Sequence, residues 1–397
     1  MRRTTASIGI LGVAAALSLT ACGSSSSSSP SAGGSSGSTG GVTAACSLDN
    51  PPQSAAKLPK TVNLGKTTGK VGVILPDTTS STRYTEYDAP LLTKALKDAG
   101  ITPLVQNAQG DKNKFASIAQ SMIGQGVKVL IIDSIDAASG AGVEKAADKA
   151  GVKVIDYDRV NLGGTAPYYV SFDNEDVGKL QAQTLLDCLK AQGVDSPKII
   201  MMNGGTDVDN NAVLFQKGAH SVLDNSSAEI VAEATVKGWL VQNAAPAFTG
   251  ALTSAGGQVD GVLAANDDIA NAVIGVLKNN QLNGKVAVTG QDSGVEGLQN
   301  IVTGQQSMTV FKNVKLEANA AAQLAIALIA GKDPAAAGMT LTKFDDPESP
   351  SHNIQALLLP AQVITQANVN DVVKAGALTT AQICKGIESD CANIGLQ

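Results

Sequence analysis

Polar side chains follow several short apolar runs of the chain, and their chemistry is the most informative feature of the sequence. They are carboxylates, amides and cations, and they stand at Asp158-Arg159, Asn203-Gly204-Gly205, Asn266-Asp267-Asp268, Gln291-Asp292 and Lys312. If the apolar runs are parallel strands, these positions meet at the carboxyl edges of the sheets, where such folds bind ligands. Carboxylates accept hydrogen bonds, Arg and Lys donate them, and Asn does both, which suits the hydroxyl groups of a neutral polyol.

Two of these groups have simpler alternative interpretations. Trp239 is the only tryptophan and would offer a flat apolar face to the C–H side of a ring-shaped polyol, but it could equally be a core aromatic. Asp158 and Arg159 could form a salt bridge between two lobes instead of contacting a ligand.

The same positions lack the groups that several other chemistries need. None is a Ser in a G-x-S-x-G turn, no G-x-G-x-x-G follows the first apolar run, and Gly65 to Lys70 has the wrong spacing for a phosphate-binding loop. Asp207 to Asn211 looks like the start of a calcium loop but lacks the required Gly and Glu, so Asp209 or Asn210 is better explained as a helix cap. We therefore expect no catalytic residue, no metal and no cofactor.

The elements that must position these side chains alternate along the chain. Apolar runs separated by helical stretches begin at residues 71, 103, 127, 153 and 168, and a second series begins at 198, 229, 259 and 285. Continuous apolar strands joined by helices indicate parallel sheets that are covered on both faces. The sequence therefore predicts an α/β fold with two doubly wound parallel-sheet lobes.

Composition excludes further classes of protein. The 397 residues carry 29 Lys and Arg against 35 Asp and Glu, a formal net charge of −6, which argues against a nucleic-acid-binding protein. Only two His are present, which argues against a His-based metal site or His-based catalysis.

The first residues resemble an export signal with a lipid attachment site. Arg2 and Arg3 precede a short apolar run that ends in Leu19-Thr20-Ala21-Cys22, which matches a bacterial lipobox. We expect residues 1–21 to be a lipoprotein signal peptide and Cys22 to carry the lipid, the alternative being an ordinary signal with a chance Cys. Residues 22–69 would be the lipidated Cys, a Ser/Gly-rich tether and a lead-in.

Export places the remaining cysteines in an oxidising space, where disulfides form. Cys46, Cys188, Cys384 and Cys391 allow three pairings. Cys384 and Cys391 are close in sequence and are the preferred pair. Cys46 would then pair with Cys188, unless Cys188 is a buried free thiol.

At these motifs the chain resembles the periplasmic sugar-binding proteins of ABC importers, which have the type I periplasmic binding protein fold, and among them the D-xylose binders. The resemblance runs from about residue 70 to 376. It is carried by Ser80-Ser81-Thr82-Arg83-Tyr84, Tyr157-Asp158-Arg159, Ser171-Phe172-Asp173-Asn174-Glu175, Val208-Asp209-Asn210-Asn211, Gly238-Trp239, Asn266-Asp267, Gly290-Gln291-Asp292 and Thr309-Val310-Phe311-Lys312.

The resemblance implies a set of sugar contacts at matching positions. These are Arg83, Asp158, Arg159, Asp209, Asn211, Trp239, Asn266, Asp292 and Lys312. Tyr84 stands where the family often has Trp, and Asn313 stands where the xylose binders have Pro. The resemblance implies that the ligand is D-xylose. Because of the two departures, glucose, galactose and arabinose are alternatives.

The resemblance also implies a three-segment hinge between the lobes. The crossovers would lie near Asn174, near Lys312 and in the stretch Asp345 to Glu348. Residues 70–174 and 312–340 would then form the N-terminal lobe, and residues 175–311 and 341–397 the C-terminal lobe. Two such lobes close on a ligand by a hinge motion.

Three functions are compatible with these observations. The first is a monomeric receptor that is lipid-anchored to the outer face of the cytoplasmic membrane. It would deliver an aldopentose or aldohexose to an ABC importer permease. A chemoreceptor is a second candidate partner. A sugar-acting enzyme would use paired carboxylates, but the acids here stand beside Arg and Asn, which favour ionised acceptors. A transcription regulator would need an N-terminal DNA-binding segment, where this chain has a signal and a tether.

Overall fold

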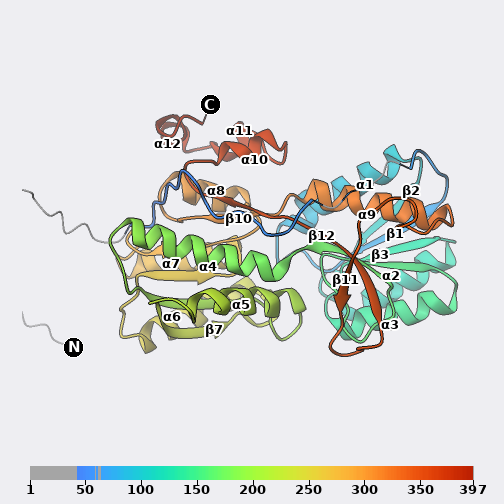
Figure 1. The fold of residues 1–397 in the computed structure, drawn as a ribbon, viewed down its shortest axis with the longest axis horizontal. Helices are drawn as coiled ribbons and strands as arrows, with labels where there is room; N and C mark the ends of the chain where they lie inside the picture. Colours follow the sequence, from blue (N-terminus) through green and yellow to red (C-terminus); the bar gives the residue numbers. More distant parts are fainter. Residues whose placement is uncertain (1–42, 59, 61–63, 397) are drawn as a thin grey trace, which may run out of the picture. The chain divides into compact units, whose positions relative to one another are not determined.

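The computed structural model describes residues 43–58, 60 and 64–396, and within these residues it has three β-sheets (Figure 1). The expected signal peptide, Cys22 and most of the tether lie outside the described residues. In the part of the chain that is described, no helix is both long and apolar enough to cross a membrane.

The first sheet is parallel except at one edge. Its order is β11 (Thr342–Asp345), β12 (Asn353–Leu359), β5 (Tyr168–Phe172), β4 (Lys153–Tyr157), β3 (Val129–Ile132), β1 (Lys70–Leu75) and β2 (Thr102–Asn107), with β11 antiparallel to β12. Val71, Val73 and Leu75 face α1 (Ala89–Asp98) and α9 (Val314–Ile329). Ile74 and the residues beside it on the adjacent strands face α2 (Lys112–Gly124) and α3 (Ala137–Lys149). Both faces are covered, which explains the continuous apolar runs in the sequence.

The second sheet repeats this design. Its order is β7 (Glu229–Thr235), β6 (Lys198–Asn203), β8 (Gly261–Ala264) and β9 (Ala287–Val288), all parallel. One face packs against α4 (Asn174–Ala191) and α5 (Asn210–Leu223), and the other against α6 (Ala244–Ser254) and α7 (Asp267–Asn279). Helices α4 and α5 approach closely because Gly178 and Gly218 lie between them. A Cβ at either glycine would lie 2.0 Å from a backbone oxygen of the other helix.

Most of the remaining elements lie beside the second sheet, but the π-helical turn packs with α1 and α9 of the first. They are a π-helical turn (Tyr84–Asp88), two 3₁₀ turns (Lys237–Trp239 and Val241–Asn243), α8 (Val295–Val302), β10 (Thr309–Phe311), β13 (Gln362–Ile364), α10 (Asn370–Lys374), α11 (Thr380–Ile383) and α12 (Glu388–Asn393). Strand β10 pairs antiparallel with β13. We call the first sheet with α1, α2, α3 and α9 the first lobe, and the second sheet with α4 to α8, β10, β13 and α10 to α12 the second lobe.

The chain passes between the lobes at the ends of three strands. It leaves β5 for α4 at Asp173, leaves β10 for α9 at Lys312 and Asn313, and leaves β12 for β13 at Pro360 and Ala361. The first two agree with the expected positions, but a crossover at Asp345 to Glu348 is wrong. Residues 342–359 form β11 and β12, which pair with each other and with β5, so the assignment of this stretch to the C-terminal lobe is also wrong. The backbone hydrogen bonds between β12 and β5 place β12 in the first lobe.

Both predicted disulfides are present. Cys384 pairs with Cys391 across 7 residues of sequence, and Cys46 pairs with Cys188 of α4 across 142 residues. Cys46 and Cys188 are both buried. The second bond therefore fixes the segment before β1 to the second lobe, and Cys188 is not a free thiol.

The two disulfides should contribute unequally to stability. In the chain-entropy account, a cross-link stabilises the fold by restricting the unfolded chain, by about 5 kcal/mol for the long loop and about 2.5 kcal/mol for the short one. We expect C46S/C188S to lower the free energy of unfolding by about 2 kcal/mol more than C384S/C391S, measured by urea denaturation. Equal losses would show that loop length does not govern the contribution of these bonds.

Candidate functional site

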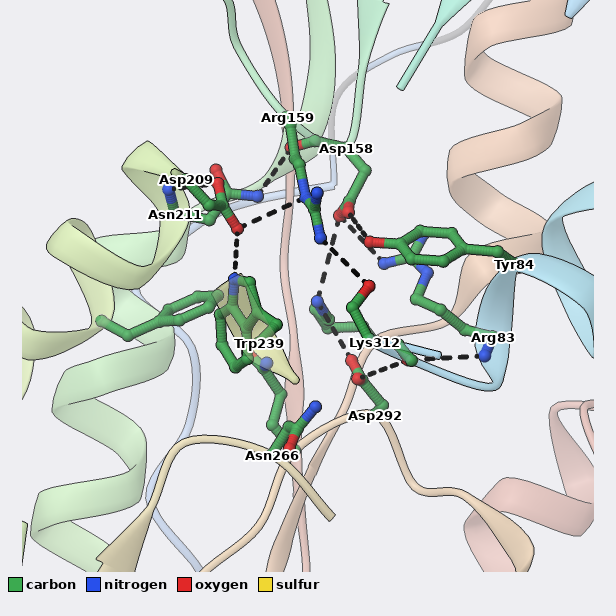
Figure 2. A pocket seen from close by; sticks show the side chains of 14 residues that line it. Arg83, Tyr84, Asp158, Arg159, Asp209, Asn211, Trp239, Asn266, Asp292 and Lys312 are labelled. Carbon is green, nitrogen blue, oxygen red and sulfur yellow. Dashed lines mark hydrogen bonds and ion pairs between the residues drawn. The ribbon is translucent and has the colours of Figure 1, made fainter. Parts of the chain in front are cut away.

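All nine residues predicted to contact a ligand line one cavity between the two lobes (Figure 2). Eight of them are buried, and Asp292 is partly exposed. The cavity is also lined by Ser80, Ser81, Tyr84, Phe215 and Gln291. All of these except Phe215 stand within the sequence motifs noted above. Phe215 lies one helical turn after Asn211 on α5 and has no local sequence signal.

The fold brings these residues together because they follow the carboxyl ends of strands. Asp158 and Arg159 follow β4, and Lys312 follows β10. Asp209 and Asn266 are the N-caps of α5 and α7, where their side chains accept from the backbone N–H groups of Asn211 and Ile269 at 2.9 Å each. The helix-cap interpretation of Asp209 is therefore correct, and the residue lines the cavity as well.

Three residues of the site have backbone conformations that are rare outside glycine. Their φ angles are 58° at Asp158, 59° at Trp239 and 90° at Asp292. Such conformations cost about 1–3 kcal/mol each and persist only where the surroundings enforce them. Their concentration around one cavity indicates that the turns are shaped to direct these side chains into it.

Arg83 is the centre of a buried ion cluster on the first-lobe side of the cavity. Its Nε and Nη2 donate to both oxygens of Asp88 at 2.9 Å, its Nη1 donates to Asp158 at 2.9 Å, and Nη2 also donates to Glu317 at 2.7 Å. The Tyr157 hydroxyl donates to Asp88 at 2.6 Å. Four of the five guanidinium hydrogens are therefore used within the protein. Arg83 mainly positions Asp158, and one N–H remains for a ligand.

This cluster keeps Asp158 ionised. Burial alone would raise the pKa of Asp158, but the charges of Arg83, Lys312 and Arg159 outweigh it and hold the pKa below its ordinary value. A carboxylate in that state accepts hydrogen bonds and is a poor proton donor.

Arg159 and Asp209 connect the two lobes across the cavity. Arg159 Nε lies 3.4 Å from Asp209 Oδ2, and Trp239 Nε1 donates to the same oxygen at 3.0 Å. Burial raises the pKa of Asp209, and Arg159 partly offsets it. On its other side, Arg159 donates from Nη1 to the Ser134 carbonyl at 3.1 Å. Arg159 Nε also lies 3.8 Å from Asp133 Oδ1, so this buried nitrogen is placed between two carboxyl groups of the protein.

Lys312 and Asp292 form a second ionic contact at the cavity. Lys312 Nζ lies 3.0 Å from Asp292 Oδ1 and 4.0 Å from Asp158 Oδ1. The hydroxyl of Ser81, from the first lobe, donates to Asp292 Oδ2 at 3.3 Å. The site thus holds three cations and three carboxylates from both lobes in direct contact.

The aromatic part of the cavity is built around Trp239. Its ring packs edge-on to Phe215 with centroids 6.4 Å apart, and it lies against Gly204 and Gly205. A Cβ at Gly204 would lie 2.1 Å from the ring, so only glycine fits there. Trp239 therefore belongs to the second-lobe core and also lines the cavity.

Asp268, in the first turn of α7, makes this region sensitive to pH. Burial and then the charge of Asp292 raise the pKa of Asp268 to about 6, and a hydrogen bond from the Thr82 backbone partly offsets this. An unperturbed Asp titrates near 4. Between about pH 4 and pH 6 the folded state holds more protons than the unfolded state. The free energy of unfolding therefore falls as the pH rises through this window.

Asp268→Asn should remove this part of the pH dependence. We expect the variant to be more stable than the wild type by about 1–2 kcal/mol at pH 7 and to match it near pH 4. Urea unfolding at pH 4, 5, 6 and 7 measures the difference, with the exposed Glu229→Gln as the control. A pH-independent difference would contradict the assignment.

The arrangement provides hydrogen-bond donors and acceptors on opposite sides of a small enclosed space. Among the described residues, no group of three or more His, Cys, Asp or Glu is arranged to hold a metal. The donors and acceptors at this cavity can hydrogen-bond a small polar molecule, with an aromatic wall beside it.

Comparison with known proteins decides the family. A model of the periplasmic binding protein domain matches residues 71–333, about two thirds of the chain. The chain belongs to the periplasmic binding protein family.

Several relatives of this periplasmic binding protein are named for sugars. It is 38% identical over 255 residues to the D-xylose-binding periplasmic protein of Escherichia coli, covering 63% of this chain and 76% of that relative. It is 34% identical over 303 residues to the protein of the same name from Haemophilus influenzae, covering 75% and 87%. A solved carbohydrate transporter solute-binding protein of Chloroflexus aurantiacus, in complex with D-glucose, superposes with a TM-score of 0.71 at 27% identity, covering 80% of this chain and 98% of that structure. The type I periplasmic binding protein fold expected from the sequence is confirmed.

Proposed function

We propose that this protein binds a monosaccharide between its two lobes and delivers it to an ABC-type sugar importer. The observation that carries the proposal is the convergence of Asp158, Arg159, Asp209, Asp292 and Lys312, with the Trp239 ring, on one small cavity. Each sugar hydroxyl donates and accepts a hydrogen bond, and charged partners on both sides satisfy both roles.

D-xylose is the proposed ligand. Two relatives that are named as D-xylose-binding proteins support it, at 38% and 34% identity. Glucose is the main alternative, because the Chloroflexus neighbour was solved with it. Galactose and arabinose remain alternatives from the motif resemblance.

Binding is proposed to occur without chemical conversion of the sugar. A glycosidase needs one carboxylic acid that stays protonated beside its ionised partner. Asp158 is held ionised by three cations, and Asp292 pairs with Lys312 at 3.0 Å. These contacts favour hydrogen-bond acceptors rather than a proton donor.

Titration of the purified protein with xylose, glucose, galactose, arabinose and ribose tests the proposal. We expect saturable binding, strongest for xylose, at micromolar concentrations or below, which corresponds to about −8 kcal/mol or better. Calorimetry and the fluorescence of Trp239 provide independent readings. Absence of binding to every one of these aldoses would overturn the receptor function, and turnover of a glycoside would favour an enzyme.

The proposed location is the outer face of the cytoplasmic membrane, held by lipid on Cys22. This rests on the lipobox at residues 19–22 of the sequence. We expect Cys22→Ser to move the protein from the membrane fraction to the soluble exported fraction, measured by fractionation and immunoblotting. Ser28→Ala, in the Ser/Gly-rich stretch after the lipobox, is the control and should leave the distribution unchanged.

A further inference from the structure

Asp267 is a buried carboxyl of the second lobe that the proposed function leaves without a role. It follows Asn266 as the first residue of α7, is 5% exposed and does not line the sugar cavity. Its Oδ2 accepts from the Gly294 N–H at 2.9 Å and from the Thr309 hydroxyl at 3.2 Å, and its Oδ1 accepts from Gln306 Nε2 at 2.9 Å. Both oxygens are therefore used within the protein.

These contacts hold the loop 290–294, which carries Asp292, on both sides of that residue. Before Asp292, the backbone N–H of Asp267 donates to the Gln291 carbonyl at 3.0 Å. After Asp292, the Asp267 carboxyl accepts from the Gly294 N–H. One residue of α7 therefore binds this loop through its backbone at one end and through its side chain at the other.

The loop has a backbone conformation that needs such support. The φ angles of Asp292 and Ser293 are 90° and 56°, so two successive residues other than glycine lie at positive φ. The Ser293 N–H donates to the Thr309 hydroxyl oxygen at 3.2 Å, and that hydroxyl in turn donates to Asp267. Conformations of this kind persist only where the surrounding structure enforces them. The contacts around Asp267 supply that constraint.

Two glycines leave room for the Asp267 carboxyl. A Cβ at Gly290 would lie 2.0 Å from Asp267 Oδ1, and a Cβ at Gly297 would lie 2.4 Å from Asp267 Cγ. Neither glycine has a positive φ angle, so space rather than backbone conformation accounts for glycine at both positions. The carboxyl is therefore closely packed as well as hydrogen-bonded.

Asp267 does not need a negative charge to hold the loop. Burial raises the pKa of Asp267 to about 8, the hydrogen bond from Gln306 partly offsets this, and the charge of Asp292 adds to it. At pH 7 the carboxyl is therefore mostly neutral. Gln306 Oε1 has no hydrogen-bond partner among the described residues, so a rotated Gln306 amide can accept the proton. An uncharged side chain of the same shape should therefore serve as well.

We propose that Asp267 is the positioning residue for Asp292, holding the loop 290–294 in the conformation that presents Asp292 to the sugar. The proposal rests on the sugar-binding function proposed above, because it concerns how that binding site is built. Asp292 contacts Lys312 at 3.0 Å and Ser81 at 3.3 Å, and both contacts depend on the conformation of the loop. Loss of Asp267 should therefore lower sugar affinity through Asp292.

Asp267→Ala and Asp267→Asn separate position from charge. The alanine variant leaves Gly294, Thr309 and Gln306 without their acceptor, and we expect xylose affinity to fall about tenfold. Asparagine keeps an oxygen for Gly294 and Thr309, so we expect its affinity to stay within about twofold of wild type. A tenfold loss in the asparagine variant would show that the charge matters and would overturn the geometric role.

Asp346→Ala is the matched control for a buried carboxyl. Asp346 is 2% exposed, follows β11 and accepts from three backbone N–H groups, but it does not line the cavity. Both alanine variants remove a buried acceptor, so both should lower the free energy of unfolding in urea. Only Asp267→Ala should lower xylose affinity, and an equal loss of affinity in Asp346→Ala would reduce the effect to general destabilisation.

A double-mutant cycle tests whether Asp267 acts through Asp292. Calorimetric titration with xylose gives the affinities of the wild type, Asp267→Ala, Asp292→Ala and the double variant. We expect Asp267→Ala to cost less than about twofold once Asp292 is already alanine. Additive losses, or wild-type affinity in Asp267→Ala, would overturn the proposal.

Hydrogen exchange of the sugar-free protein separates this proposal from the proposed function. We expect the backbone N–H groups of residues 291–294 to exchange at least about tenfold faster in Asp267→Ala and at the wild-type rate in Asp346→Ala, measured by mass spectrometry. Unchanged exchange in Asp267→Ala would refute the positioning role. If the wild type binds none of the aldoses, the receptor function fails, and the exchange rates still decide whether Asp267 holds the loop.

Thr309→Val keeps the test open if Asp267→Ala does not fold. Valine has the shape of threonine and suits a strand, but it removes the hydroxyl between Asp267 and the Ser293 N–H. We expect faster exchange at residues 291–294 and a loss of xylose affinity of about threefold. Wild-type values for both in Thr309→Val would count against the network.

Discussion

Arg83→Met is expected to lower the free energy of unfolding by about 3–5 kcal/mol, the largest effect of any single substitution in the site. Arg83 is buried and neutralises Asp88, Asp158 and Glu317 through contacts of 2.7 to 2.9 Å. Methionine fills much of the same volume without the charge. The loss therefore comes from three buried carboxyls that keep no hydrogen-bonded cation, with only Lys312 and Arg159 near Asp158.

The same substitution should change the pH dependence of stability. Arg83 lowers the pKa of Asp158 and of Glu317, so without it both folded-state pKa values rise and the folded protein binds more protons than the unfolded chain. The penalty is then greatest above the folded-state pKa values and shrinks as the pH falls toward the unfolded values near 4. Urea unfolding between pH 5 and pH 8 measures this trend.

Lys94→Met is the matched control for Arg83→Met. Lys94 pairs with Asp98 at 2.6 Å, but both side chains are well exposed, at 72% and 65%. Exposed pairs contribute less than about 1 kcal/mol because water and salt screen them. Equal losses in the two variants would mean that burial of the Arg83 cluster does not matter.

Arg159→Ala is expected to reduce xylose affinity by at least a hundredfold while the protein stays folded. Arg159 lines the cavity, and although its Nε lies against Asp209 and Asp133, its Nη2 has only a long contact of 3.4 Å to Ser80. The two N–H groups of Nη2 can therefore donate to a sugar, and charge-assisted hydrogen bonds contribute about 1.5–3 kcal/mol each. Two such bonds account for a hundredfold or more.

Two further variants make the Arg159 result specific. Arg159→Lys keeps the charge but loses the planar pair of donors, so an intermediate loss of about tenfold is expected. Lys237→Ala removes an exposed cation that does not line the cavity and should leave affinity unchanged. Calorimetric titration with xylose gives all three values. Wild-type affinity in Arg159→Ala would show that the sugar does not contact this group.

Local sequence patterns were sufficient to predict part of the site. Asp158, Arg159, Asn266, Asp292 and Lys312 follow apolar runs, and the carboxyl ends of parallel strands necessarily meet at one edge of a sheet. Asp209, Asn211, Trp239 and Arg83 needed the motif resemblance, because nothing in their immediate neighbours places them at such an edge. All nine line the cavity, and their contact with a sugar stays a proposal.

Other features had no local signal. Asp88 and Glu317 complete the Arg83 cluster from positions 5 and 234 residues away. The sequence predicts the wrong lobe for residues 342–359, because the side chains of a strand do not identify the strand with which it pairs. Strand β12 lies beside β5, about 185 residues earlier in the chain, through backbone hydrogen bonds that any sequence can make.

The sequence by itself determined the class of fold, the chemistry of the cavity lining and the candidate cysteine pairs, since these depend on periodicity, residue type and count. Tertiary structure decided that Arg83 is mostly used within the protein, that the third crossover is at Pro360, and that the segment before β1 is fixed to the opposite lobe. These outcomes depend on contacts between residues far apart in the chain. Such contacts form only when whole surfaces pack, and no local pattern encodes them.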